Sequence, residues 1–431
     1  MSSEWPIVKL GLLADFQEGY VNPSQREPSY FDGPVKWLRA TDLNDGLVTG
    51  TTRTLSEKGF RSAGKSAVLF EPGTLAISKS GTIGRVGLLG DYMCGNRAVI
   101  NIKPKPNSVP RYLFFVLRHL RPTIETLAEG SVQKNLYVST LSNLEVPAPP
   151  KEIQKAFADT LGVLDDRIAL LRETNATLEA IAQALFKSWF VDFDPVRAKM
   201  AGRAPEGMDE ATAALFPDAL EETELGLVPK GWRVGTLDSI AALNPESWSS
   251  KHHPDRLLYV DLANTKENQI EGITEFAFDE APSRARRVLR EGDVIVGTVR
   301  PGNRSFARIS VDRTGLTGST GFAVLRAHHH SDQALVYIAA TRDEAIERLA
   351  HLADGGAYPA VRPEVVAGTP VVIAPDSVRQ AFGEVANHLL AGVGSNQEKS
   401  RYLADLRDTL LPRLISGQLR LPEVPAHLEA A

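Results

Sequence analysis

The sequence contains a single cysteine, Cys94, among 431 residues. One cysteine excludes an internal disulfide and every zinc site built from several cysteines, as is typical of proteins in a reducing compartment. Long apolar runs are also lacking, because no stretch approaches the roughly 20 residues that span a bilayer. The first ten residues, MSSEWPIVKL, do not combine a basic start with an apolar run. The sequence therefore predicts a cytoplasmic protein without a transmembrane helix.

Recognisable catalytic sets are lacking too. No Glu-x-Lys triplet of the kind used by metal-dependent nucleases occurs in the chain. The triplets NPE (244–246) and DPV (194–196) do not continue into the Asn- or Asp-Pro-Pro-aromatic element with which methyltransferases grip a flipped adenine. The histidines at 252–253 and 328–330 have no partner at metal-ligand spacing. We predict no catalytic residue, no metal site and no cofactor bound by this chain.

One motif does match a nucleotide-binding pattern. GFRSAGKS (59–66) satisfies the phosphate-loop pattern GxxxxGK[ST] letter for letter. A phosphate loop follows a buried strand and opens a helix, whereas AVLFEPG after Ser66 is strand-like and is broken by Pro72. An NTPase is therefore a rival interpretation that the surrounding sequence disfavours.

A surplus of basic charge is lacking, since 48 Lys and Arg stand against 53 Asp and Glu. Residues 1–150 carry 17 basic and 13 acidic residues, residues 151–230 carry 9 and 15, and residues 231–376 carry 16 and 19. The acidic excess is therefore largest between residues 151 and 230. A local basic face is still available from Arg284, Arg286, Arg287 and Arg290.

Self-similarity organises the chain, because the same landmarks recur after about 220–227 residues. Trp5 with Leu10 recurs as Trp232 with Leu237. Each copy then has a strand-like run, a glycine loop and a short apolar strand closed by proline. These are EPGTLAIS (71–78), GSVQKNL (130–136) and LEVPAPP (144–150) in the first copy, and REGDVIVG (290–297), GAYPAVR (356–362) and PVVIAP (370–375) in the second. The chain is therefore two copies of one unit.

A heptad-like seam follows each copy, with apolar residues spaced alternately by three and four. The first seam contains Phe157, Leu161, Leu164, Ile168, Leu171, Asn175 and Leu178. The second contains Val385, Leu389, Asn396, Leu403, Leu406 and Leu410. Either helix could simply pack on its own domain. Two seams at equivalent places in a repeat favour pairing of the helices with each other, and a helix of 35–40 residues would span roughly 50–60 Å.

The predicted fold is α+β. Residues 1–150 and 231–376 form two globular domains with β-sheet cores. Residues 151–190 and 377–419 form a long antiparallel two-helix coiled-coil spacer that separates them, which gives a pseudo-two-fold internal repeat. The acidic segment 191–230 is a connector and residues 420–431 form a C-terminal tail.

Two loops in each copy have the composition of DNA-reading loops. SKSGTIGR (78–85) and GTVRPGNR (297–304) combine glycines, which allow close backbone approach, with cations that contact phosphates or guanine edges. Each side chain could equally belong to an ordinary solvated loop, and the equivalence of the two copies favours recognition. The candidate DNA-binding residues are Lys79, Ser80, Thr82, Arg85, Gln133, Lys134, Asn135, Arg300, Asn303, Arg304, Tyr358 and Arg362.

Three longer stretches carry a family resemblance: LFKSWFVDFDPVRAKMAGRAPEGM (185–208), FPDALEETELGLVPKGW (216–232) and LRDTLLPRLISGQL (406–419). Supporting matches are EVPAPPKEIQ (145–154) and EPGTLAISKSGTIG (71–84). The chain resembles the specificity subunits of type I restriction-modification enzymes over nearly its whole length. The second glycine loop, GAYPAVR, departs from the polar run usual in the family.

The resemblance implies that residues 1–150 and 231–376 are two target recognition domains. Each would read one part of a bipartite site in double-stranded DNA while the helices act as a ruler. It implies docking of two modification subunits, which bring S-adenosylmethionine and methylate adenine, and of restriction subunits, the motor-nucleases that use ATP with Mg. The helices around 151–190 and 377–419 would carry the partner surfaces. The low net charge indicates that the isolated chain does not hold DNA tightly. Two alternatives stay open: a complex that only methylates, and a scaffold that does not read DNA.

Overall fold

The chain folds into two compact units in a computed structural model that describes residues 4–130, 134–224, 226–356 and 358–420. The first unit comprises residues 1–169 and 401–431, and the second comprises residues 170–400. Each unit therefore contains one copy of the repeat together with a part of each long helix. Among the described residues, no helix combines the length and the apolar character needed to cross a membrane.

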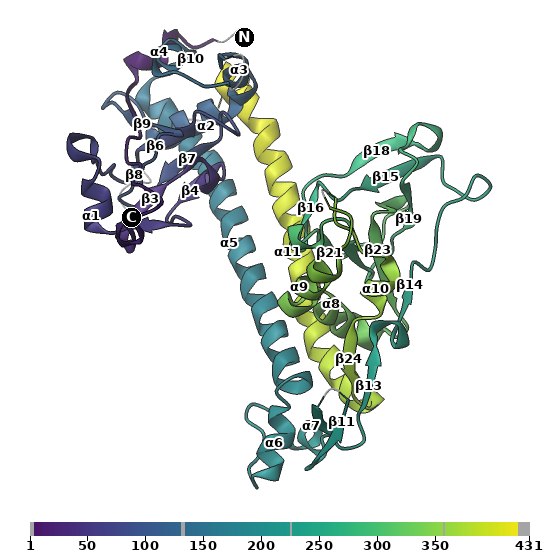
Figure 1. Ribbon diagram of the computed structural model, residues 1–431. Helices are drawn as coiled ribbons and strands as arrows, with labels where there is room; N and C mark the ends of the chain where they lie inside the picture. Colours follow the sequence, from purple (N-terminus) through teal and green to yellow (C-terminus); the bar gives the residue numbers. More distant parts are fainter. Residues whose placement is uncertain (1–3, 131–133, 225, 357, 421–431) are drawn as a thin grey trace, which may run out of the picture. The chain divides into compact units, whose positions relative to one another are not determined.

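The first unit is built on a five-stranded sheet of order β2-β9-β6-β7-β4 (Figure 1). A three-stranded sheet of order β5-β3-β8 and the pair β1–β10 accompany it. The central strand β6, LAIS, is buried along its whole length, as a continuous apolar run predicts. The strands are β1 (Ile7–Lys9), β2 (Ala14–Glu18), β3 (Phe31–Leu38), β4 (Gly46–Val48), β5 (Thr54–Leu55), β6 (Leu75–Ser78), β7 (Val86–Leu89), β8 (Cys94–Gly95), β9 (Val99–Pro104) and β10 (Glu145–Pro147). The helices are α1 (Glu57–Arg61), α2 (Pro110–His119), α3 (Arg121–Thr126) and α4 (Val138–Ser142).

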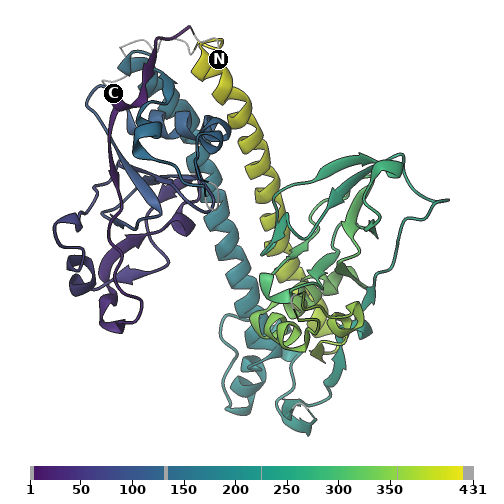
Figure 2. The same cartoon turned by 45° about the horizontal axis from the view of Figure 1, so that its top comes forward.

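The second unit repeats this plan with a four-stranded sheet of order β14-β23-β20-β21, a second sheet of order β18-β15-β22-β19, and the pair β13–β24 (Figures 1 and 2). Two hairpins, β11–β12 and β16–β17, complete it. The strands are β11 (Leu220–Thr223), β12 (Gly226–Pro229), β13 (Arg233–Thr236), β14 (Ala241–Leu243), β15 (Arg256–Val260), β16 (Thr265–Lys266), β17 (Gln269–Ile270), β18 (Thr274–Ala277), β19 (Ala285–Val288), β20 (Val294–Gly297), β21 (Phe306–Arg308), β22 (Leu316–Ser319), β23 (Phe322–Ala327) and β24 (Pro370–Ile373). The helices are α6 (Asp194–Met200), α7 (Glu210–Ala214), α8 (Gln333–Thr341), α9 (Asp343–Leu352) and α10 (Pro363–Ala367).

The topology confirms the internal repeat. The order β2-β9-β6 in the first unit corresponds to β14-β23-β20 in the second, and the pair β1–β10 corresponds to β13–β24. In both units a helix follows the long strand directly, α2 after β9 and α8 after β23. The mixture of sheets and helices also confirms the α+β class.

Two long helices, α5 (Lys151–Phe190) and α11 (Asp376–Ser416), follow the two copies. In the first unit Arg407 on α11 donates to the carboxylate of Asp165 on α5. In the second unit the amide of Asn396 on α11 donates to Oδ1 of Asn175 on α5 at 2.9 Å, and Asn175 donates to the carbonyl of Val393 at 3.3 Å. In the second unit Phe190 of α5 also meets Phe382 of α11. Partners further along α5 therefore lie earlier along α11, so the predicted antiparallel pairing is confirmed.

The predicted seam of α11 coincides only in part with the face that contacts α5. Asn396 meets Asn175 of α5 as the seam requires, whereas other predicted members are exposed. Val385 is 50% exposed and Leu406 is 37% exposed. Leu389, Asn396, Leu403 and Leu410 are half-buried. The stripe that is buried contains Val378, Phe382, Ala386, Leu390, Val393, Arg407, Leu411 and Leu414.

The sequence allows two registers because apolar residues often come in adjacent pairs, such as Leu389–Leu390 and Leu410–Leu411. The observed buried stripe also contains a charged residue, Arg407, which the spacing of apolar residues does not indicate. On α5, Phe157, Leu161, Ile168 and Leu171 are buried, while Leu164, Asn175 and Leu178 are half-buried.

An aromatic cluster holds the end of α5 in the second unit. Trp189 meets Phe216 edge to face with ring centroids 5.0 Å apart, and Phe190 meets Phe382 of α11 in the same way at 5.0 Å. Trp232, before β13, lies 5.8 Å from Phe190. The segment 191–230 therefore contributes to the core through Phe216 as well as connecting the two copies.

Matched valine substitutions on α11 test the register of the seam. Val393→Ala is expected to lower the free energy of unfolding by about 2 kcal/mol, because it removes two buried methyl groups. Val385→Ala is expected to change it by less than about 0.5 kcal/mol, because this side chain lies half in solvent. The gain in helix propensity is the same for both changes. Urea unfolding of the two variants measures the difference, and equal losses would contradict the observed seam.

Candidate nucleic-acid interface

The loop between β6 and β7 is closed by Ser78. The Ser78 amide donates to the carbonyl of Arg85 at 2.9 Å, and the Arg85 amide donates to the Ser78 hydroxyl at 2.9 Å. Gly84 donates to the Ser78 carbonyl at 3.0 Å. Because Ser78 is fully buried, the intervening residues 79–83 form a fixed loop at the end of a core strand.

Lys79 joins this loop to the second predicted loop of the first unit. Its amide donates to the carbonyl of Ala98 at 2.9 Å, and its carbonyl accepts from the amide of Leu136 at 2.9 Å. Glu129 and Asn135 exchange two backbone hydrogen bonds, of 3.0 and 2.8 Å, which close the loop between them. The structure therefore brings together residues 79–85 and 134–135, as their shared predicted role requires.

The same frame recurs in the second unit, hydrogen bond for hydrogen bond. Thr298 takes the place of Lys79, since its amide donates to Gly321 at 2.8 Å and its carbonyl accepts from Val361 at 2.9 Å. Asp354 and Ala360 exchange backbone hydrogen bonds of 3.1 and 2.8 Å, as Glu129 and Asn135 do in the first unit. The two loop pairs are therefore built by equivalent backbone contacts.

Two of the predicted cations are held by carboxylates of their own unit. Lys79 lies 2.7 Å from Glu18, and both side chains are mostly buried. Arg304 contacts Glu267 at 3.0 Å and Asp343 at 2.6 Å. These contacts already occupy the charged ends of both side chains. Lys79 and Arg304 therefore stabilise the loops through ion pairs within their own units.

The other candidates differ in exposure. Arg300 is exposed, and its guanidinium lies 4.7 Å from the ring centroid of Tyr358, which is 70% exposed. Ser80, Arg85 and Asn135 are half-buried. The remaining exposed candidates are Thr82, Lys134, Asn303 and Arg362. Gln133 lies outside the described residues.

Two further residues lie beside these loops and were missed by sequence reasoning. Tyr137 follows Leu136 and is 43% exposed. Arg97 is exposed and precedes Ala98, whose carbonyl accepts from Lys79. Tyr137 could have been found, since it adjoins a predicted loop. Arg97 could not, because its proximity to Lys79 depends on the pairing of β6 with β9.

One of the arginines that suggested a basic face, Arg290, is paired with a carboxylate of its own unit. Both nitrogens Nε and Nη2 of Arg290 donate to the carboxylate of Glu246, at 2.8 and 2.7 Å. Arg326 also donates to Glu246 and to buried Asp293. Hydrogen bonding from Arg290, reinforced by Arg326, lowers the pKa of Glu246 to about 2. This network braces the sheet β14-β23-β20 more than it offers charge to DNA.

The phosphate-loop match does not form a phosphate loop. Gly59, its first glycine, lies inside α1 and is buried, and residues 64–66 form a single 3-10 turn. No strand-loop-helix arrangement surrounds the motif, so the geometry gives no support to the NTPase alternative. Over the part of the chain that the structure describes, no three His, Cys, Asp or Glu side chains are grouped to hold a metal ion.

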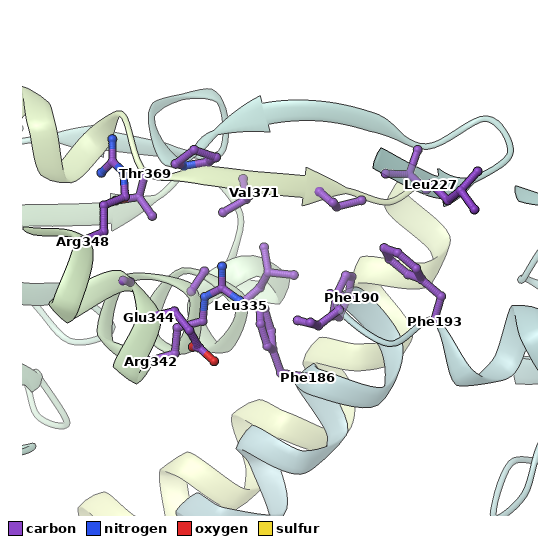
Figure 3. Close-up of a pocket in the computed structure, with 16 residues that line it drawn as sticks. Phe186, Phe190, Phe193, Leu227, Leu335, Arg342, Glu344, Arg348, Thr369 and Val371 are labelled. Atoms are coloured by element: carbon purple, nitrogen blue, oxygen red, sulfur yellow. The ribbon is translucent and has the colours of Figure 1, made fainter. Parts of the chain in front are cut away.

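A cavity of about 440 Å³ lies in the second unit, away from these loops. Figure 3 shows Phe186, Phe190 and Phe193 along one side of it, from the end of α5 and the residues that follow, with Val371 of β24 opposite. Arg342, which precedes α9, and Glu344 of α9 lie at its polar side. None of the candidate DNA-binding residues lines it, so the cavity is separate from the predicted interface.

Comparison with known proteins shows which family the chain resembles. The family model described as "Type I restriction modification DNA specificity domain" matches residues 2–180. The type I restriction enzyme MjaIX specificity subunit of Methanocaldococcus jannaschii is 24% identical over 98% of this chain and 95% of its own length. The type I restriction enzyme HindI specificity subunit of Haemophilus influenzae is 24% identical over 77% of this chain and 82% of its own length.

The fold is shared as well. The crystal structure of the type I restriction-modification system S subunit from M. genitalium matches with a TM-score of 0.54 and 15% identity over 97% of both chains. The match to the specificity-domain model is confined to residues 2–180, the amino-terminal part of the chain. Its resemblance to type I specificity subunits, indicated by the sequence motifs, is confirmed over nearly the whole length.

The network around Glu246 predicts that the stability of the folded protein depends on pH. Because the pKa of Glu246 lies near 2 in the folded protein, its stabilising contribution is complete above its ordinary pKa of 4.5 and disappears as the pH falls toward 2. Glu246→Gln should therefore lower the unfolding temperature at pH 7, and the deficit should shrink between pH 4.5 and pH 2. Thermal melts across this range measure it, with Glu384→Gln at an exposed position of α11 as the control. A deficit that is the same at pH 7 and pH 3 would rule out this linkage.

Proposed function

We propose that this chain is the non-catalytic DNA specificity subunit of a type I restriction-modification complex, and that residues 1–150 and 231–376 each read one half of a bipartite site. The observation that carries the proposal is the recurrence of one backbone frame, around Lys79 and around Thr298, in a chain whose relatives are specificity subunits. A scaffold would not need two copies of a loop pair fixed at the ends of core strands.

The physical basis of reading lies in the exposed and half-buried side chains on these frames. Arg300 and Lys134 present cations to a phosphate backbone or a guanine edge, and the amide of Asn135 suits an adenine edge. The frames are held by backbone hydrogen bonds, so side chains can change between relatives while the loops keep their shape. This property fits a protein whose partners stay constant while its target sequence changes.

The proposed partners are double-stranded DNA, two modification subunits and the restriction subunits. S-adenosylmethionine, ATP and Mg would be bound by those subunits, and adenine methylation and DNA cleavage would be theirs. Exposed apolar residues share one face of α5, namely Val163, Leu170 and Ile181, and offer a docking surface for a modification subunit. Because such a complex acts on DNA, we propose that it lies in the cytoplasm. A complex that only methylates has the same requirements for this chain.

Exchange of one recognition domain tests the modular reading. Replacing residues 1–150 by the corresponding residues of a relative should change one half of the methylated site and leave the other half as it was. Mapping methylated adenines in cells that express the complex gives the result. The reciprocal exchange of residues 231–376 is the control and should change only the other half. A change in both halves after a single exchange would defeat the modular proposal, and a lack of any sequence-specific site would favour the scaffold.

Substitution of Arg300 tests whether the second loop pair contacts DNA. Arg300→Ala should weaken binding of the complex to its site by about 1–3 kcal/mol, or roughly 5–150-fold, because a contact to a phosphate or base is lost. Arg256→Ala, on β15, removes the same charge from an exposed position in the same unit and should cost less than about threefold. Titration of labelled duplex at fixed salt measures both. Equal losses for the two variants would show that the loop itself makes no contact.

A further inference from the structure

The β16–β17 hairpin turns at Glu267 and Asn268, which have φ values of 45° and 63°. Two successive residues with positive φ define the tight hairpin turn for which asparagine is suited. A turn of this kind usually lies in solvent, yet Asn268 is only 5% exposed. Burial of a polar turn residue requires that its donors and acceptors find partners.

Asn268 finds those partners on three elements. Its side-chain amide donates to Glu179 of α5, and its carbonyl accepts from Nε2 of Gln397 of α11 at 2.6 Å. On the sheet side, its backbone amide donates to the carbonyl of Phe306 at 2.8 Å, and its Oδ1 accepts from the amide of Arg308 at 2.8 Å. One residue therefore joins both long helices to strand β21.

The neighbouring residue connects the same turn to the candidate DNA loop. The amide of Glu267 donates to the carbonyl of Arg304, the last residue of loop 297–304, at 2.9 Å. The Glu267 carboxylate lies 3.0 Å from the Arg304 guanidinium. The next residue, Ser305, accepts from the amide of Gly297 at 2.7 Å and so closes the loop on β20. The contacts run without a gap from the helices through the turn to the loop.

We propose that the turn Glu267–Asn268 is a clamp that fixes the loop 297–304 relative to the helix pair, and that Asn268 is a positioning residue for the spacing between the two half-sites. The inference rests on the proposed function. A recognition loop that rotates on its helices would meet DNA at a different point along the groove, and B-DNA rises about 3.4 Å per base pair. A clamp between loop and helices therefore restricts which spacing is accepted, without touching a base.

Asn268→Gly is the sharpest test, because glycine keeps the positive φ and both backbone hydrogen bonds while it removes the side chain. Binding of the complex assembled with its modification subunits is measured on duplexes that carry the mapped half-sites at the native spacing and at one base pair more or less. The wild-type complex should prefer the native spacing. In the variant, the ratio of the affinity at the native spacing to the affinity at the altered spacings should fall about tenfold, because the Glu179 carboxylate and the Arg308 amide lose their partner. The bases read in each half-site should be unchanged.

Two substitutions on α5 keep the inference testable if the glycine variant folds poorly. Glu179→Gln retains an oxygen that accepts from Asn268 and should keep the wild-type preference, whereas Glu179→Leu should relax it as Asn268→Gly does. A uniform loss of affinity at all three spacings, or an unchanged preference in both Asn268→Gly and Glu179→Leu, would overturn the clamp. Absence of any bipartite site with the wild-type complex would instead overturn the proposed function itself.

Discussion

The hydrogen bond between Asn175 and Asn396 fixes the register of the helix pair in the second unit. Two amides in an apolar seam satisfy each other in one alignment only, and a slip of either helix by a turn would leave both without a partner. Glu179 lies one turn beyond Asn175 on α5, and Gln397 follows Asn396 on α11. The two side chains that meet Asn268 are therefore brought to one level by the same alignment, so the position of the hairpin depends on the register of the seam.

The first unit fixes its helices by different chemistry. There Asp165 of α5 accepts from Arg407 of α11 and lies 3.4 Å from Arg118 of α2, while Arg111 of α2 donates to Asp166 at 3.0 Å and to the carbonyl of Gly162 at 3.0 Å. A charged pair thus joins helix to helix in the first unit, whereas neutral amides do so in the second. In the second unit ion pairs still join α11 to its domain, through Arg379 with Asp332 and Arg313 with Glu398, and a half-buried carboxylic group on α5 contacts the hairpin. Burial raises the pKa of that group, Glu179, although its hydrogen bond with Asn268 opposes the rise. The duplicated backbone has kept its topology while the side chains that fasten it have diverged.

The sequence was sufficient for the repeat, the α+β class and the pairing of the helices, because these depend on patterns that extend over many residues. It was insufficient for the whole buried stripe of α11, because Leu389–Leu390 and Leu410–Leu411 fit two registers and the stripe includes a charged residue, Arg407. The loops were found because glycines and cations recur at equivalent places. Which cations face solvent could not be deduced, because Arg304 and Arg300 look alike in sequence and differ only in whether Glu267 and Asp343 lie within reach.

Internal pairing of cations explains the modest charge of a chain proposed to read DNA. Lys79, Arg290 and Arg304 each lie against a carboxylate of their own unit, so their charges stabilise the domains and are partly neutralised before DNA arrives. Affinity for duplex DNA grows with the number of phosphates that a surface neutralises, and each contact adds to the salt dependence. A DNA-binding protein with few cations in contact with phosphates gains little affinity from nonspecific binding. Such a chain is suited to supply discrimination while partner subunits supply most of the affinity, which is the division of labour expected of a specificity subunit.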